Sequence, residues 1–287
     1  MDRRQYLCGV IAAGLLGLPS AALARRPRLL TDPELDAALV VDAASGKVLY
    51  ARNETATRHP ASLTKLMTLY LLFEALRAKK LTLGNELAVS AHAAEQPRSH
   101  LRLRDGTTIS VEMAIKAIII RSANDAAVVV AEAVGGSEPV FVVMMNAKAR
   151  QLGMTDTTYC NATGLPDSGQ LTTADDLAIL ARHVIYDFPE YFPYFSTRSM
   201  TWHGQEYETH DALIVDYPGA DGLKTGYIEA SGYNLVTTVK RGDTRLIAVV
   251  MGGITPARRD EAMVRLLDDV FAQLAAAAPP GPAPKHN

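Results

Sequence analysis

The chain has 287 residues, of which 48% are hydrophobic and 21% are charged. This composition is that of an ordinary globular protein, so it excludes a disordered or fibrous chain and allows a sizeable core. The formal charge of −2 and the absence of long Lys/Arg runs argue against nucleic acid as the main partner and favour a small-molecule or neutral polymer substrate.

Residues 1–24 are predicted to be a secretory signal peptide. They combine a basic start, an apolar run from Tyr6 to about Leu18 and the small-x-small site Ala22-Leu23-Ala24, after which the mature, exported chain would begin at Arg25. The apolar run falls short of the roughly 20 residues that a membrane span needs, so cleavage is favoured over anchoring. Arg3-Arg4 leaves both Sec and twin-arginine export open.

The cysteines fit an exported protein that has no disulfide. Cleavage would remove Cys8 and leave Cys160 alone, so stability must come from core packing. Cys160 lies in the turn-rich segment DTTYCNATGLP, which contains no histidine. We therefore favour a small, buried hydrophobic role for Cys160 over a nucleophilic one.

Hydrophobic patterning predicts one α+β domain over residues 25–278 and a disordered tail at 279–287. Residues 38–53 alternate apolar and polar side chains around Ser45-Gly46, as in a β-hairpin. From Leu63 the apolar residues recur every three or four positions, which predicts a helix with one face in the core. Strands at both ends and helices between them indicate one sheet assembled from distant segments. The further predicted helices are 111–120, 124–135, 139–153, 172–185 and 255–278, and the further predicted strands are 199–202, 233–240 and 246–251.

Two of these helices carry start signals. Thr173 and Asp176 resemble a capping box in which Asp replaces Glu. Thr255-Pro256 supplies an N-cap followed by proline at the first helical position.

A lysine in the first turn of the helix near Ser62 is unexpected. Lys65 opposes the helix dipole there, and burial would lower the pKa of its ammonium group. Ser62 and Lys65 share a helix face, so Lys65 could accept the proton of the Ser62 hydroxyl and make it a nucleophile. Because Ser-x-x-Lys occurs about once by chance in such a chain, and Ser62 could be only an N-cap, the pair alone is weak evidence.

Two further motifs strengthen the case. Ser122-Ala123-Asn124 lies between two apolar helical segments, and Lys224-Thr225-Gly226 lies on an expected edge strand facing a cleft. Together with Ser62 and Lys65, and in the same order, they match the motif set of penicillin-recognising acyl enzymes.

Across roughly residues 30–275 the chain resembles the low-molecular-mass D-alanyl-D-alanine carboxypeptidases, the S11 serine peptidases, which are penicillin-binding proteins. The segments that carry the likeness are HPASLTKLMT, MMNAKARQLGM, NATGLPDSGQLTTADDLAILAR, YPGADGLKTGY and SGYNLV. The resemblance implies a serine-transpeptidase/β-lactamase-like three-layer fold, with an antiparallel sheet covered by helices and a helical subdomain. It also implies a periplasmic bacterial enzyme that acts on peptidoglycan stem peptides, removes their terminal D-alanine and is covalently inhibited by β-lactams.

The resemblance assigns a role to each motif residue. Ser62 would attack the carbonyl of the penultimate D-alanine, and neutral Lys65 would take its proton. Ser122 and Lys224, across the cleft, would relay a proton to the leaving group. Asn124 would hold the substrate amide and help to fix Lys65.

The resemblance also implies how the substrate is held. The Thr225 hydroxyl and the charge of Lys224 would bind its terminal carboxylate, and Gly226 would let the edge strand approach it closely. The backbone N–H groups of Ser62 and Tyr227 would form the oxyanion hole. Water would then hydrolyse the acyl-enzyme.

The chain departs from the family pattern in three respects. Tyr227 occupies a position where His or Tyr is common, and its phenol could alter deacylation. The segment EYETHDALIVDYP lacks the expected Asn-rich pattern, and we favour solvated loop positions over substrate contacts for His210 and Asp211. The chain stops soon after its last core helix, so no stable membrane anchor is expected; this shortness resembles the endopeptidase branch, which cuts peptidoglycan cross-links.

Other classes fit less well. The seven histidines, His59 among them, show no metal-ligand spacing, so we expect neither a metal nor a cofactor. A β-lactamase needs a carboxylate that activates the deacylating water, and the Glu-x-x-Leu-Asn pattern of one class is absent. A DD-endopeptidase and a non-catalytic penicillin- or peptidoglycan-binding module remain as alternatives, although such a module usually lacks a catalytic side chain.

Overall fold

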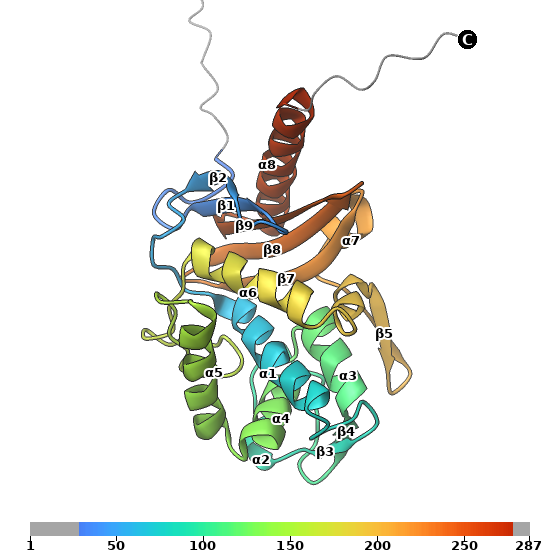
Figure 1. The fold of residues 1–287 in the computed structure, drawn as a ribbon. Helices are drawn as coiled ribbons and strands as arrows, with labels where there is room; N and C mark the ends of the chain where they lie inside the picture. Colours follow the sequence, from blue (N-terminus) through green and yellow to red (C-terminus); the bar gives the residue numbers. More distant parts are fainter. Residues whose placement is uncertain (1–28, 278–287) are drawn as a thin grey trace, which may run out of the picture.

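A five-stranded antiparallel sheet joins the two ends of the chain (Figure 1). The computed structural model describes residues 29–277, so the predicted signal peptide at 1–24 and tail at 279–287 lie outside the described residues. The strand order is β2-β1-β9-β8-β7, which confirms that distant segments form one sheet and leaves β7 at an edge, as predicted. The strands are β1 Ala37–Asp42, β2 Val48–Arg52, β7 Ala220–Ile228, β8 Gly232–Arg241 and β9 Thr244–Gly253.

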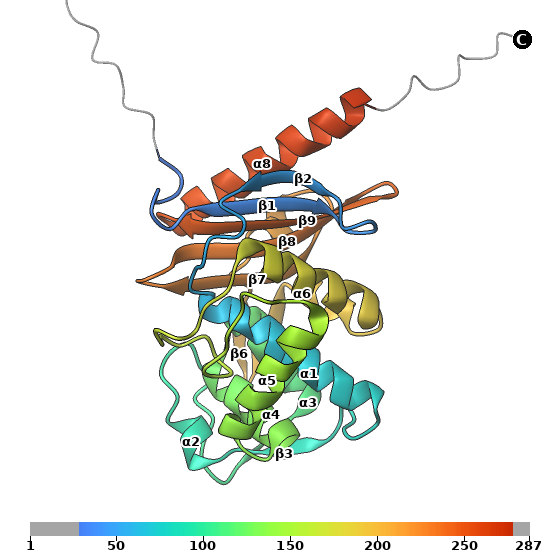
Figure 2. The same cartoon turned by 60° about the vertical axis from the view of Figure 1, so that its left-hand side comes forward.

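Helices cover both faces of this sheet. Successive side chains of a strand point to opposite faces. On β1, Leu39 packs into the apolar cluster that contains the central helices, whereas Val40 packs against the C-terminal helix. Figure 2 shows α8 on one side of the sheet and α6 on the other. The result is a three-layer α+β fold, as predicted.

Most of the helices lie on the face opposite α8, in the layer that contains α6 and in the helical region beyond it (Figure 2). Within residues 29–277, no single helix is long and apolar enough to span a membrane. Helices α4 and α5 reach that length and apolar character only when they are taken together, and they are bent by 81° relative to each other. The helices are α1 Lys65–Arg77, α2 Ala91–Ala94, α3 Val111–Lys116, α4 Asn124–Gly135, α5 Glu138–Leu152, α6 Ala174–Asp187, α7 Leu213–Asp216 and α8 Pro256–Ala277, with short helical turns η1 Ala61–Thr64, η2 Ala117–Arg121 and η3 Phe192–Ser196.

Helix α1 corrects one prediction. Periodicity predicted one buried face, but 11 of its 13 residues are buried. The helix passes through the middle of the helical region and packs against α4, α5 and α6 (Figure 1). A helix surrounded in this way is apolar on all sides, so the buried Lys65 at its start needs a specific explanation.

The strand predicted at 199–202 is confirmed, but its place outside the main sheet was not predicted. It forms as β5 Ser199–Trp202 but pairs only with β6 Gln205–Glu208, outside the main sheet. A second small sheet, β3 Glu86–Ala88 with β4 Thr108–Ser110, was not predicted. Three-residue strands are too short to show a clear alternation of apolar and polar residues.

The two predicted helix starts behave differently. Thr255 caps α8 by accepting the backbone N–H of Arg258 at 3.2 Å, as predicted. Thr173 caps α6 by accepting the N–H of Asp176 at 3.1 Å, but the Asp176 carboxylate accepts instead from the segment at 156–157. Because Asp is one methylene shorter than Glu, the return half of the capping box does not form.

Candidate active site

The three sequence motifs meet at one cleft of about 640 Å³ between the edge strand β7 and the helical region. Ser62, Ser122, Asn124, Thr225, Gly226 and Tyr227 line it, whereas Lys65 and Lys224 are fully buried behind it. The cleft thereby brings together Ser62 and Tyr227, which are 165 positions apart in the sequence.

The first wall of the cleft is the turn that carries Ser62 and Lys65. Ser62 lies within η1, whose N-cap is Pro60, and the N-cap of α1 is Thr64, so Ser62 caps neither helix. The Lys65 amine lies 3.0 Å from the Ser62 hydroxyl oxygen. This geometry contradicts the interpretation of Ser62 as a mere N-cap and favours a functional pair.

The Lys65 amine has two further acceptors. It donates to Oδ1 of Asn124 at 2.8 Å and to the backbone carbonyl of Thr163. Burial, reinforced by the positive charge of Lys224 and opposed by Asp125, lowers the pKa of Lys65 well below its ordinary value. A neutral amine in this position can accept the proton of a serine hydroxyl.

The second wall is the corner between η2 and α4. Asn124, the first residue of α4, donates from Nδ2 to the carbonyls of Pro97 and Arg98 at 2.9 and 3.1 Å, so its orientation toward Lys65 is fixed. Ser122 adopts left-handed backbone angles, with φ 56°, which cost a non-glycine residue about 1–3 kcal/mol. Within residues 29–277 its buried hydroxyl has no hydrogen-bond partner.

The third wall is β7. Lys224 donates to the carbonyl of Thr225 at 3.1 Å, and burial lowers its pKa to about 7, with Asp211 opposing and Arg259 adding to the shift. No hydrogen bond joins Lys224 to Ser122 among the described residues. A Cβ on Gly226 would lie 3.1 Å from the backbone nitrogen of Ser62, so a larger residue would push β7 and that turn apart by a few tenths of an ångström.

Three titratable residues outside the three motifs also lie at or near the cleft. Arg259 of α8 is 3% exposed, lines the cleft and donates to Asp260. Asp211 is 6% exposed, not solvated as favoured above; burial raises its pKa to about 6, and its Oδ2 has no partner within residues 29–277. His210 lines the cleft and its ring nitrogen lies 3.2 Å from Arg121.

These residues carried little sequence signal. Arg259 lies in an amphipathic helix in which charged residues are common, so only the fold brings it to the cleft. Asp211 follows an exposed hairpin and looked like any loop acid. The absence of the Asn-rich pattern around it was the one signal that this segment is unusual.

Aromatic rings form one end of the cleft. Tyr227 is 51% exposed, and its ring stacks on Tyr233 with 4.2 Å between centroids and an interplanar angle of 24°. Tyr227 therefore presents an open apolar surface to a ligand.

Two other sequence candidates lie apart from this chemistry. Cys160 is half-buried, not fully buried as predicted, and burial beside Asp167 raises the pKa of its thiol, which disfavours a nucleophilic thiolate. His59 contacts the carbonyl of Gln170 at 2.9 Å and so serves the loop structure. Within residues 29–277, no cluster of three or more His, Cys, Asp or Glu side chains could hold a metal ion.

The family model for D-alanyl-D-alanine carboxypeptidases, Peptidase_S11, matches residues 26–255. A curated relative, the D-alanyl-D-alanine carboxypeptidase DacF of Bacillus subtilis, is 38% identical over 251 residues, which cover 84% of this chain and 63% of the relative. The chain thus spans less than two thirds of that relative's length.

Solved structures of penicillin-binding proteins are also similar to this chain. Penicillin-binding protein 5 of Haemophilus influenzae superposes with a TM-score of 0.81 at 33% identity, covering 86% of this chain and 72% of that one. Penicillin-binding protein D2 of Listeria monocytogenes, solved in a cefotaxime-bound form, has a TM-score of 0.73 at 31% identity and is covered completely by 86% of this chain.

Proposed function

The chain belongs to the S11 family of D-alanyl-D-alanine carboxypeptidases, and from this premise we propose that it removes the terminal D-alanine from peptidoglycan pentapeptides through an acyl-enzyme on Ser62. The observation that carries the proposal is the buried Lys65 amine, 3.0 Å from the Ser62 hydroxyl. A merely structural lysine would be paired with a carboxylate and stay charged. Here the direct partners of Lys65 are a hydroxyl, an amide oxygen and a backbone carbonyl.

Acylation begins when the Ser62 oxygen attacks the carbonyl carbon of the penultimate D-alanine and its proton passes to the neutral Lys65 amine. The tetrahedral oxyanion is stabilised by the backbone N–H groups of Ser62 and Tyr227. The C–N bond then breaks, and Ser122, with Lys224 behind it, delivers a proton to the leaving D-alanine nitrogen. The proton that Lys65 took from Ser62 replaces the one that Ser122 gave, so Lys65 is neutral again. This leaves an ester on Ser62.

The sheet side of the cleft binds the substrate's terminal carboxylate. Charge-assisted hydrogen bonds from Lys224 and the Thr225 hydroxyl hold it, and the buried Arg259 adds positive charge. Asn124 holds the substrate amide on the opposite wall. The ester is then hydrolysed by water, which gives its proton to Lys65 as the Ser62 oxygen leaves and is reprotonated.

The cellular setting follows from the sequence. We propose that residues 25–278 act as one peptidase domain, exported to the periplasm of a bacterium by the predicted signal peptide. Its partners are peptidoglycan stem peptides, with β-lactams as covalent inhibitors. Inhibition by β-lactams is supported by one relative that this chain covers completely, a penicillin-binding protein solved with bound cefotaxime.

The test is mass spectrometry of the purified chain with three probes: benzylpenicillin, a disaccharide pentapeptide and a cross-linked muropeptide dimer. We expect a penicilloyl adduct on Ser62 and loss of one D-alanine from the pentapeptide. S62A serves as the control and should show neither.

Each other result changes the assignment. Cleavage of the dimer without loss of D-alanine from the pentapeptide would identify the protein as a DD-endopeptidase instead. An adduct without any cleavage, or neither adduct nor cleavage, would contradict the proposed hydrolytic activity and favour a non-catalytic binding module.

A further inference from the structure

The direction of the Lys65 lone pair depends on two oxygen atoms. A neutral amine has two N–H groups and one lone pair. If the N–H groups donate to Oδ1 of Asn124 and the carbonyl of Thr163, the lone pair is left facing the Ser62 hydroxyl. The Thr163 carbonyl is therefore as important for orientation as Asn124, although it belongs to a loop.

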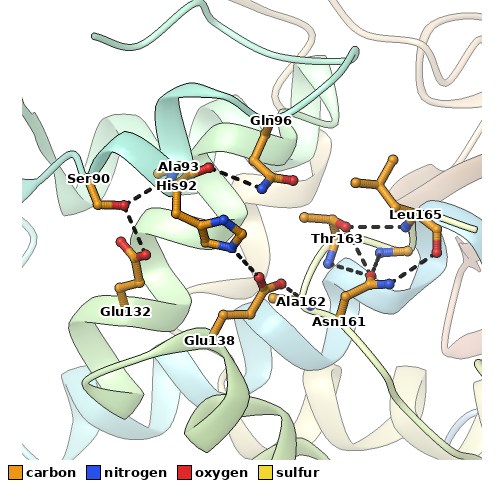
Figure 3. A network of polar contacts seen from close by, with 11 residues as sticks. Ser90, His92, Ala93, Gln96, Glu132, Glu138, Asn161, Ala162, Thr163 and Leu165 are labelled. Carbon is orange, nitrogen blue, oxygen red and sulfur yellow. Dashed lines mark hydrogen bonds and ion pairs between the residues drawn. The ribbon is translucent and has the colours of Figure 1, made fainter. Parts of the chain in front are cut away.

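That loop is held in shape by its own asparagine (Figure 3). Oδ1 of Asn161 accepts the backbone N–H groups of Thr163 and Gly164 at 3.2 and 2.8 Å, and its Nδ2 donates to the carbonyl of Leu165 at 3.1 Å. This turn fixes the loop internally. It does not fix the position of the loop relative to α1, where Lys65 lies.

The peptide units of Ala162 connect the loop to the helices. The Ala162 carbonyl accepts the Thr68 hydroxyl of α1 at 2.7 Å. The Ala162 N–H donates to Oε1 of Glu138, the first residue of α5, at 2.9 Å (Figure 3). The residue immediately before Thr163 is thus held from two sides.

Glu138 is itself anchored. Its other oxygen, Oε2, lies 2.7 Å from Nε2 of His92 in α2, and its side chain is only 13% exposed. One carboxylate therefore joins α2, α5 and the loop. Its neighbour Glu132 makes a comparable contact to the same region, accepting the Ser90 hydroxyl at 2.9 Å, but its carboxylate does not contact the loop (Figure 3).

We propose that Glu138 is a positioning residue for the proposed general base: through the Ala162 N–H it holds the Thr163 carbonyl on the Lys65 amine, and so aims the Lys65 lone pair at Ser62. This inference rests on the proposed acyl-enzyme function. It adds to that function a residue that touches neither the substrate nor Lys65.

The test compares three variants in the full chain. E138A removes the acceptor, E138Q keeps an oxygen for the Ala162 N–H, and E132A removes the matched contact to Ser90. For each, intact-mass spectrometry gives the rate and the final stoichiometry of the benzylpenicillin adduct, and D-alanine release from the pentapeptide gives kcat and KM.

We expect E138A to slow acylation roughly tenfold, since misdirected proton transfer costs part of the 10²–10⁴-fold that general-base catalysis contributes. Its kcat should fall with little change in KM, and the final adduct should still reach one per chain. E138Q should recover most of the rate. E132A should acylate at the wild-type rate, although we expect it to lower Tm by about as much as E138A does.

Several outcomes overturn the inference. Equal rates in E138A and the wild type would do so, as would equal slowing in E132A, because then only general stability matters. If E138A does not fold, T68V replaces it, because T68V removes the hydrogen bond to the Ala162 carbonyl. T68V should then also acylate more slowly than the wild type. A wild-type acylation rate in T68V would refute the inference. Failure of the proposed function is distinguishable, since the wild-type chain itself would then form no adduct.

Discussion

The two buried lysines of the cleft, Lys65 on the helical side and Lys224 on the sheet side, are arranged in opposite ways. Lys65 lies within hydrogen-bond distance of three oxygen atoms, so in its neutral form the two N–H groups and the lone pair all have partners. Lys224 donates only to the carbonyl of Thr225 among the described residues. One lysine is thus oriented before substrate arrives, whereas the other keeps donors free for an incoming anion.

The surrounding charges strengthen this difference. Burial lowers the pKa of both lysines, to about 7 for Lys224, where the negative charge of Asp211 opposes the shift. Near pH 7 a large share of Lys224 is therefore charged, whereas burial disfavours the charged form of Lys65. We propose that the same residue type serves as a base on one wall and as an anion site on the other.

Removing the base should have the largest effect. K65M keeps a long, uncharged side chain but offers no acceptor for the Ser62 proton, so acylation by benzylpenicillin should slow by about a thousandfold. The adduct rate measured by intact mass checks this. An acylation rate within tenfold of the wild type would show that another group acts as the base.

Removing the anion site should affect binding more than chemistry. In K224M, KM for the pentapeptide should rise roughly tenfold to a hundredfold, because a hydrogen bond to a charged group contributes about 1.5–3 kcal/mol. Steady-state D-alanine release measures this, and kcat should fall by a smaller factor. A fall in kcat alone would reverse the roles proposed for the two walls.

The charge of Asp211 should set the pH range in which the anion site works. Wild-type affinity for the pentapeptide should weaken as pH rises through about 7, since Lys224 then loses its proton. D211N removes the negative charge that raises the pKa of Lys224, so the decline should begin at lower pH. Identical KM profiles in the two proteins would contradict this coupling.

The same variant has a predicted effect on stability. The pKa of Asp211 is about 6 in the folded chain, above the ordinary 3.8, so the folded state holds this proton more tightly than the unfolded state. The contribution of Asp211 is therefore lost as pH rises from about 4 to about 6. D211N should match the wild type in Tm near pH 4 and exceed it above pH 6, as thermal unfolding at several pH values would show.

The phenol of Tyr227 should matter least. Its ring is half exposed and held by stacking on Tyr233, and a phenylalanine keeps that stacking. Y227F should therefore acylate and deacylate within about twofold of the wild type, as adduct formation and decay measure. A tenfold slower decay of the adduct would show that the phenol takes part in deacylation. It would also weaken the two-lysine account, in which Lys65 acts as the base and Lys224 binds the anion.

The sequence predicted the residues of the site that belong to motifs of fixed spacing. Ser62 and Lys65 share one turn, Lys224 lies on a strand, and a motif at fixed spacing identifies such residues. Arg259 and Glu138 were not predicted, and Asp211 was expected to be solvated, because each reaches its place through tertiary packing, which spacing along the chain does not reveal. The carbonyl of Thr163 could not be found at all, since any residue supplies a carbonyl.

The fold shows the same limit. The long strands β1, β8 and β9 have apolar patterns that identify them, and the cap at Thr255 was read correctly. The partner of β5 was not, because a four-residue strand does not specify which strand it pairs with. The full burial of α1 depends on three helices that come later in the chain, so its own periodicity underestimated it.

The most direct test of the two-lysine account uses two peptide substrates that differ only in ending with a free carboxylate or with an amide. For the wild type, kcat/KM should favour the carboxylate strongly. For K224M this preference should largely disappear, whereas for the E138A variant, which disturbs only the Lys65 side, it should be unchanged. A preference that survives in K224M, or is lost in E138A, would contradict the division of roles between the two lysines.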